Sequence, residues 1–210
     1  MYQSDTSDPE RLVEELRDSG VPAIDIPWDL EQADRLPKLL DRVEEELGPL
    51  SILVNNAAWS TRDGWEELTA EQIDRHYAVN ARATAMLSVE FCRRFTRESG
   101  GRIINFSSGQ HLGPMSGELA YAMSKAAIVT FTESLAPAVM GKGITVNAVN
   151  PGVTDTGWIS AALAKELMPS MPAGRFGMPE DAARAVAWLA SDEAAWITGQ
   201  VINSEGGFVR

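Results

Sequence analysis

Three apolar segments of strand length, none of which alternates with polar residues, most constrain the fold of this chain. They are SILVNN at 51–56, GRIINFSS at 101–108 and ITVNAVNP at 144–151. A strand that is apolar at consecutive positions is buried on both faces, which is typical of a parallel sheet covered by helices. Helical patterns at 69–100 and 118–143 separate the three segments. The chain is therefore predicted to be an α/β protein with a doubly wound parallel sheet.

The remaining segments extend this alternation to both sides. Residues 8–20 predict a helix with Asp8 as its N-cap and Gly20 at its end, and further helices are predicted at 33–48 and 179–194. Short strands are predicted at 21–30 and 199–207. The segment 69–100 opens with a Thr69/Gln72 capping box and is long enough for two helices, or for one with a joint near Asn80.

Composition limits the kind of protein. At 210 residues with 44% apolar content, the chain suits one domain, here taken as 1–210. A net charge of −12 argues against nucleic-acid and anionic-membrane surfaces, which need clustered Lys and Arg. The single cysteine, Cys92, fits a packed thiol in a reducing compartment. With neither a leader pattern nor an apolar run of membrane length, a cytoplasmic location is expected.

Polar residues follow the predicted strands at the point where each one ends. Because ligands of open parallel sheets bind beyond the carboxyl ends of the strands, these residues mark one rim as the candidate site. A tyrosine and a lysine four residues apart, Tyr121 and Lys125, lie on the helix after the second strand and share one face of it. The polar strand ends are Asn55 and Asn56, Ser107 and Ser108, and Asn150 with Pro151 and Gly152.

Five motifs in this order resemble the short-chain dehydrogenase/reductase family, from about Asp29 onward. They are NNAA at 55–58, YAVNARA at 77–83, INFSSG at 104–109, YAMSK at 121–125 and NPGVTDTG at 150–157. Within the family, the chain is most similar to bacterial 3-oxoacyl-[acyl-carrier-protein] reductases. The resemblance implies a Rossmann-like fold, NADP or NAD as cofactor, and hydride transfer to or from a small carbonyl or alcohol, possibly linked to acyl-carrier protein.

The resemblance assigns four catalytic residues, and their chemistry is reasonable. Tyr121 is the acid/base, but a phenol with a pKa of about 10 is a poor base at neutral pH. An ammonium at about 4 Å contributes around 4 kcal/mol in a sheltered site, so Lys125 is expected to lower that pKa if water is partly excluded. Ser108 would hydrogen-bond the substrate oxygen, and Asn80 would anchor a water that leads protons to Lys125.

The resemblance also assigns binding residues. The cofactor set is Asp29, Leu30, Asn55, Ala57, Tyr121, Lys125, Pro151, Gly152 and Thr154, and the substrate set is Gln110, His111 and Trp158. Plainer interpretations stay open: the serines can simply end a strand, Asn80 can bond local backbone, and Asp29 can cap a helix. The two histidines lack metal-ligand spacing, and His76 is expected to be structural.

The sequence departs from the family at its start, because no turn of the T-G-x-x-x-G-x-G kind occurs. Roughly 40 to 50 residues, covering the first strand, first helix and second strand of the dinucleotide fold, are expected to be missing. Either the full protein has them, or the sheet is rebuilt, or the chain is an inactive relative that serves as an interaction module. Epimerase, dehydratase or dehalogenase chemistry on the same fold is a further alternative. The family implies a homo-oligomer, a tetramer or dimer paired through helices at about 80–98 and 120–140.

Overall fold

The computed structural model describes residues 9–210, so Asp8, the predicted N-cap, lies outside the described residues. Within this range, parallel strands form one sheet in the order β1-β2-β3-β4. The strands are β1 (Ile52–Asn55), β2 (Gly101–Phe106), β3 (Ile144–Asn150) and β4 (Val201–Asn203). The strands predicted at 51–56, 101–108, 144–151 and 199–207 are confirmed.

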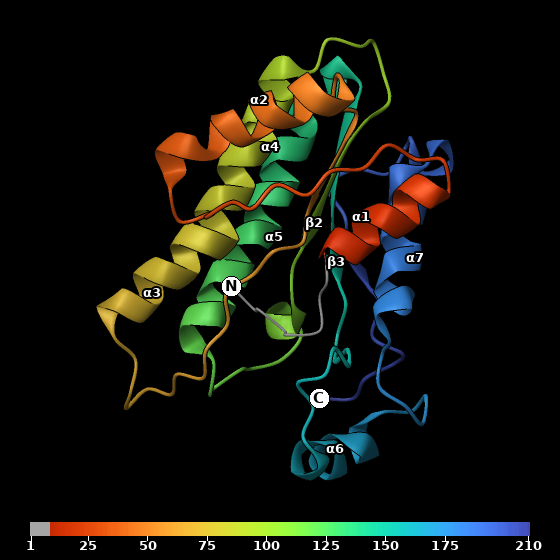
Figure 1. The fold of residues 1–210 in the computed structure, drawn as a ribbon. Helices are drawn as coiled ribbons and strands as arrows, with labels where there is room; N and C mark the ends of the chain where they lie inside the picture. The colour runs from red at the N-terminus through yellow and green to blue at the C-terminus, as the bar shows by residue number, and fades with distance from the viewer. Residues whose placement is uncertain (1–8) are drawn as a thin grey trace.

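Helices cover both faces of this sheet, as Figure 1 shows. Neighbouring residues of β2 prove the layering, because Ile103 packs in a cluster with Phe91 and Val139, whereas Ile104 packs in another with Leu189. The α/β, Rossmann-like prediction is confirmed. The helices are α1 (Pro9–Asp18), α2 (Leu36–Leu47), α3 (Ala70–His76), α4 (Ala83–Arg94), α5 (Leu119–Val139), α6 (Ala161–Leu167) and α7 (Pro179–Ala190).

Burial differs between the middle and the edge of the sheet. Every residue of β3 is buried, as are the first five residues of β2, which explains their unbroken apolar pattern. In contrast, β1 alternates, with Ile52 44% and Val54 40% exposed. Among residues 9–210, β1 has a strand neighbour on one side only.

The strand predicted at 21–30 does not form, and the prediction was wrong. This segment runs without regular structure from α1 to the short 3₁₀ turn at Ala33–Arg35. A strand needs a neighbour to bond its N–H and C=O groups, and two prolines, Pro22 and Pro27, lack an N–H. With no described strand along the open edge of β1, the apolar pattern of 21–30 has nothing to pair with.

The long helical pattern at 69–100 divides at the predicted joint. The Thr69/Gln72 capping box opens α3, and a π-helical turn at Tyr77–Arg82 joins α3 to α4. Such turns widen the helix by one residue and are frequent at functional sites. Asn80 lies inside this turn and is fully buried.

The interior also accommodates the single cysteine. Cys92 is buried on α4 in the cluster with Phe91 and Ile103, and burial raises the pKa of its thiol, which confirms the packed-thiol prediction. No helix in the described part of the chain is long and apolar enough to span a bilayer.

Candidate active site

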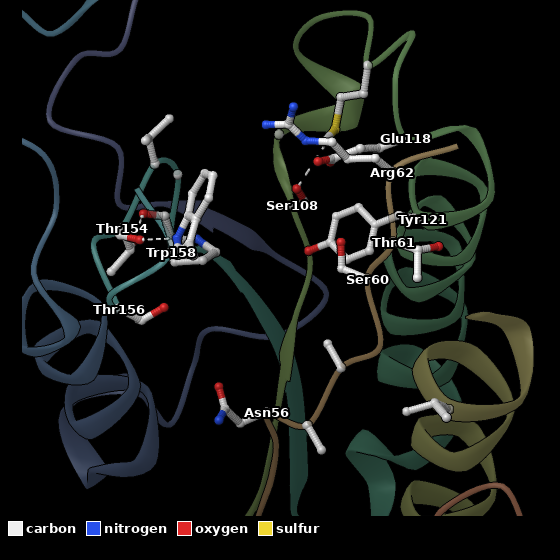
Figure 2. A pocket seen from close by; sticks show the side chains of 18 of the residues that line it. Asn56, Ser60, Thr61, Arg62, Ser108, Glu118, Tyr121, Thr154, Thr156 and Trp158 are labelled. Atoms are coloured by element: carbon white, nitrogen blue, oxygen red, sulfur yellow. Dashed lines mark hydrogen bonds between the residues drawn. The ribbon is translucent and has the colours of Figure 1, made fainter. Parts of the chain in front are cut away.

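A cavity of about 1210 Å³ opens at the carboxyl ends of the strands, where the sequence places the site. Its walls come from the turns after β1, β2 and β3, the start of α5 and the last residues of the chain. Figure 2 shows Tyr121 and Ser108 across the cavity from Thr154 and Trp158. The predicted residues that line it are Asp29, Leu30, Ala57, Ser108, Tyr121, Pro151, Gly152, Thr154 and Trp158.

Ser108, Tyr121 and Lys125 come together as predicted. Tyr121 is in the first turn of α5, and its side chain lines the same wall of the cavity as Ser108, which follows the end of β2. Lys125 lies one turn further along α5, with its ammonium 5.7 Å from the centre of the Tyr121 ring. The Lys125 side chain is 2% exposed and does not line the cavity.

The expected lowering of the Tyr121 pKa is wrong for the free chain. Burial raises the pKa of the Tyr121 phenol to about 12; the charge of Glu118 raises this pKa further, and the neighbouring Ser108 hydroxyl lowers it. The Lys125 Nζ donates instead to the carbonyl oxygen of Phe106 at 2.7 Å. Burial lowers the pKa of this lysine to about 8. Its ammonium therefore hydrogen-bonds the end of β2 rather than the phenol oxygen of Tyr121.

Asn80 connects the π-helical turn to the segment after β1. Its amide accepts from the Trp59 N–H at 2.6 Å and donates to the Trp59 carbonyl at 2.8 Å and to Ser124 Oγ at 2.8 Å. These partners are 21 and 44 residues away, so the local-backbone interpretation is wrong. The partners of the Asn80 side chain are thus Trp59 and Ser124, and the expected water that leads from Asn80 to Lys125 stays a prediction.

His76 and Asp63 fix the same segment at two further points. The Thr61 N–H donates to His76 Nε2 at 3.2 Å, while His76 Nδ1 faces the Gln72 carbonyl at 2.7 Å. Asp63 Oδ1 accepts from the N–H of Ala120 at the start of α5. Both His76 and Asp63 are fully buried, and the His76 ring meets that of Tyr121 edge-on at 6.4 Å. The structural role predicted for His76 is confirmed.

The cofactor-side residues divide into cavity-lining and structural ones. Asn55 lies outside the cavity lining, and its side-chain amide donates to Ser88 on α4 and to Asn105 on β2, whereas Asn56 and Ala57 line the cavity. Asp29 lines it as well, but its carboxylate accepts from the Glu31 N–H and from Gln32, which lowers its pKa. It thus closes a turn before the 3₁₀ segment at 33–35 rather than capping a helix.

The opposite wall is built on the turn after β3. Gly152 has a φ of +62°, which only glycine adopts readily, and its N–H donates to Asn150 Oδ1 at 3.1 Å. Thr154 Oγ1 donates to the Pro151 carbonyl at 2.9 Å, and Trp158 Nε1 donates to the Thr154 carbonyl at 2.8 Å. This places the aromatic side chain of Trp158 over the cavity (Figure 2).

Two predicted substrate residues are placed elsewhere. Neither Gln110 nor His111 lines the cavity. The amide atoms of Gln110 are buried without a hydrogen-bond partner, and His111 is exposed with Nδ1 3.2 Å from the Ser108 carbonyl. Both are in the 3₁₀ turn Gly109–His111, which directly follows Ser108.

Sequence reasoning missed several charged residues of the cavity. Glu118 precedes Tyr121 by one helical turn, a spacing that shows in the sequence, and burial raises the pKa of its carboxyl. No local pattern marks the others, because they are brought together only by tertiary folding. The charged residues missed are Glu31, Arg62, Arg75, Glu118, Glu205 and Arg210.

The described residues hold no group of three or more His, Cys, Asp or Glu that could bind a metal ion.

Comparison with known proteins places this geometry in a family. A family model described as Enoyl-(Acyl carrier protein) reductase matches residues 1–209. The chain is 49% identical over 211 residues to "Uncharacterized oxidoreductase YjdA" of Bacillus subtilis, covering all of this chain and 84% of that protein. It is 32% identical over 209 residues to the 3-oxoacyl-[acyl-carrier-protein] reductase FabG of Staphylococcus aureus, covering 98% and 85%.

A solved structure agrees with the sequence match. A short-chain dehydrogenase from Burkholderia cenocepacia, determined in complex with NADP, superposes with a TM-score of 0.90 at 32% identity. The match covers 98% of this chain and 84% of that one. With fold, motif order and overall sequence in agreement, the chain belongs to the short-chain dehydrogenase/reductase family of oxidoreductases.

Proposed function

We propose that this chain reduces a carbonyl carbon with NADP(H) or NAD(H), and that Tyr121 donates the proton to the substrate oxygen. The single observation that carries the proposal is that Ser108 and Tyr121 line one wall of the cavity and face Thr154 on the other. Two hydroxyl groups next to the substrate's carbonyl oxygen can act on it together: one donates the proton, and the other donates a hydrogen bond that stabilises the developing negative charge.

The residues fit the two ends of a dinucleotide. Asp29 and Ala57 line the end of the cavity that would hold adenosine, and Gly152 and Thr154 the end that would hold nicotinamide. A cavity of about 1210 Å³ has room for both cofactor and a small substrate. The bound cofactor supplies the hydride, and the Burkholderia relative was solved with NADP, which supports this choice.

The protein's own groups then have distinct tasks. Tyr121, with a pKa of about 12, is protonated at neutral pH and is ready to donate to an alkoxide as the carbonyl is reduced. Ser108 holds the substrate oxygen beside that phenol. Lys125 holds the end of β2 through the Phe106 carbonyl, and Asn80 holds the wall at Trp59. Its family motif implies that Lys125 also binds the nicotinamide ribose; because Lys125 does not line the cavity in the free chain, we propose that its side chain reaches the ribose only when the cofactor is bound.

A 3-oxoacyl thioester is the substrate class we propose, because the relative in Staphylococcus aureus is named for 3-oxoacyl-acyl-carrier-protein reduction. The cavity lining includes Pro114 and Met115 after Ser108 and Trp158 on the facing wall, and these apolar side chains suit an acyl chain beyond the reacting carbonyl.

Fluorescence titration with NADPH and NADH tests the cofactor, and NADPH oxidation at 340 nm with acetoacetyl-CoA tests the reaction. Binding of one cofactor and turnover are expected. If neither cofactor binds to the 210-residue chain, the reductase proposal is wrong for this polypeptide, which leaves the interaction-module alternative. If a cofactor binds but no 3-oxoacyl thioester is turned over, only the substrate class is wrong.

We further propose that the chain forms a homo-oligomer through the face of α4 and α5. Large apolar side chains are exposed in this part of the molecule, with Tyr77 54%, Met86 39% and Met123 55% exposed. Large apolar side chains that are exposed in one part of a molecule favour association. Light scattering that gives the mass of a single 22.8 kDa chain would contradict this proposal.

A further inference from the structure

An ion pair that the family motifs do not include lies in the lining of the cavity. Arg210 Nη1 donates to Glu205 Oε2 at 3.2 Å, and Nη2 donates to Oε1, so the guanidinium and carboxylate meet in a bidentate pair. Only 8% of the Glu205 side chain and 23% of the Arg210 side chain are exposed. Both line the cavity that contains Ser108 and Tyr121. A bidentate ion pair that is shielded from solvent fixes the relative orientation of its two side chains as well as neutralising their charges.

On one side, Arg210 fits into the turn that follows Ser108. A Cβ on Gly109 would lie 2.1 Å from Arg210 Nη2, and a Cβ on Gly113 would lie 2.4 Å from Arg210 Cδ. Neither glycine has a positive φ, so the backbone conformation does not require glycine at either position. The missing side chains instead leave the space that Arg210 occupies.

On the other side, Glu205 packs on the turn after β3. A Cβ on Gly152 would lie 2.8 Å from Glu205 Cγ and 3.0 Å from Glu205 Cα. Gly152 belongs to the wall that carries Thr154. One ion pair therefore contacts both turns between which substrate and cofactor would meet.

The segment that carries the pair is itself attached to the fold. The Ser204 N–H donates to the Asn150 carbonyl at 2.8 Å, and the Val209 N–H donates to the Ser170 carbonyl at 2.9 Å. The Arg210 guanidinium also lies over the Phe208 ring, 5.1 Å from its centre. Because both ends of the segment are hydrogen-bonded to the rest of the fold, the ion pair can hold the Ser108 turn and the Gly152 turn at a fixed distance from each other.

We propose that the Glu205–Arg210 pair is a positioning brace that sets the separation between the Ser108 turn and the Gly152 turn. Its catalytic consequence rests on the proposed reductase function, whereas its effect on the Ser108 turn does not. Glu205 and Arg210 act through Ser108 and Thr154 and are positioning residues rather than catalytic ones.

Substitution of Arg210→Ala tests the brace in turnover. Loss of the guanidinium lets the two turns separate, and a misplacement on the order of 1 Å lowers reaction rates by about 10-fold to 100-fold. We expect kcat to fall by about 10-fold while the dissociation constant of the cofactor changes less than about two-fold. Arg210→Lys, which keeps the charge without the planar fork, should recover only part of the loss. An unchanged kcat in Arg210→Ala would overturn the proposal.

A double-mutant cycle tests whether the side chain of Arg210 is what prevents a larger residue at Gly113. Gly113→Ala should lower kcat by about 10-fold in the native chain but by less than about two-fold in the Arg210→Ala background, where the obstructing side chain is gone. Gly117→Ala is the matched control, because a Cβ there meets nothing within 4 Å. Equal losses from Gly113→Ala in both backgrounds would overturn the proposal.

Hydrogen exchange tests the brace without any turnover. The N–H groups of Leu112 and Gly113 both donate to the Gly109 carbonyl, at 2.9 and 3.2 Å. Arg210→Ala should speed their exchange by about 10-fold, with little change at β3. If the native chain reduces no carbonyl, the proposed function fails, and the exchange rates alone decide the brace. Unchanged exchange at Leu112 and Gly113 would overturn it.

Discussion

The two walls of the cavity are built in different ways. The wall with Tyr121 rests on α5 and the π-helical turn, and its supporting side chains His76, Asn80 and Lys125 are at most 2% exposed. The facing wall consists of the turn after β3 and the segment after β4, and its Trp158 is 40% exposed. Proton transfer needs atoms held at fixed positions, which a rigid wall provides. Substrate binding requires side chains that differ from one substrate to another, and turns accommodate such changes more easily than helices do.

Removal of the phenol oxygen should have the largest effect. Tyr121→Phe takes away the proton donor, and kcat for carbonyl reduction should fall by about 10³-fold or more. Cofactor affinity, measured by fluorescence titration, should change less than about two-fold, because that binding depends mainly on the rest of the cavity. Tyr77→Phe, at a tyrosine that is 54% exposed, is the control and should keep full activity. Undiminished turnover in Tyr121→Phe would contradict the assignment of Tyr121 as the proton donor.

The pH dependence should differ between the two directions of the reaction. With a Tyr121 pKa of about 12, the phenol is protonated across neutral pH, so Tyr121 should add no pH dependence to kcat/KM for reduction from pH 6 to about 9. Alcohol oxidation needs the phenolate, and its kcat/KM should rise by up to about 10-fold per pH unit over the same range. A plateau of the oxidation profile near pH 7 would mean that the bound complex lowers this pKa after all.

Lys125→Met should abolish activity and yet stabilise the free chain. Burial lowers the folded-state pKa of Lys125 to about 8 from 10.5, so the unfolded chain binds more protons between these values. The stability of the native protein should therefore rise as pH increases from about 8 to 10.5, and below pH 8 the buried charge is a cost. The Lys125→Met substitution should therefore raise the free energy of unfolding at pH 7 by about 1 to 3 kcal/mol, reduced by the contribution of the hydrogen bond to Phe106 that is lost. Denaturant unfolding measures this, and a less stable variant would contradict the burial argument.

Trp158→Ala should have the smallest effect. Because Trp158 is 40% exposed and belongs to the wall of turns, its loss should cost under about 1 kcal/mol of unfolding free energy. We expect KM for a long-chain carbonyl substrate to rise by about 3-fold to 10-fold, with kcat nearly unchanged. Steady-state kinetics with short and long acyl chains measure the difference. A fall in kcat equal to that of Tyr121→Phe would remove the distinction between the two walls.

The middle of the fold was predictable because local and tertiary preferences agree there. The segments around Ile103 and Val146 are apolar at consecutive positions and are indeed buried on both faces. Segment 21–30 has the same kind of pattern but no partner, so its local preference has no effect. Helix α6 was not predicted, because its seven residues carry too short a pattern.

The site was predictable to the extent that its residues are fixed by spacing. Tyr121 and Lys125 share a helix face, and Ser108 follows a strand end, so the sequence by itself placed this wall on one edge of a parallel sheet. The sequence did not determine the direction of the Tyr121 pKa shift, because desolvation and the turn of Lys125 toward Phe106 depend on how the helix packs. Tertiary structure alone brought Arg210 to Gly109 and Glu205 to Gly152, since contacts over such sequence separations have no local signal.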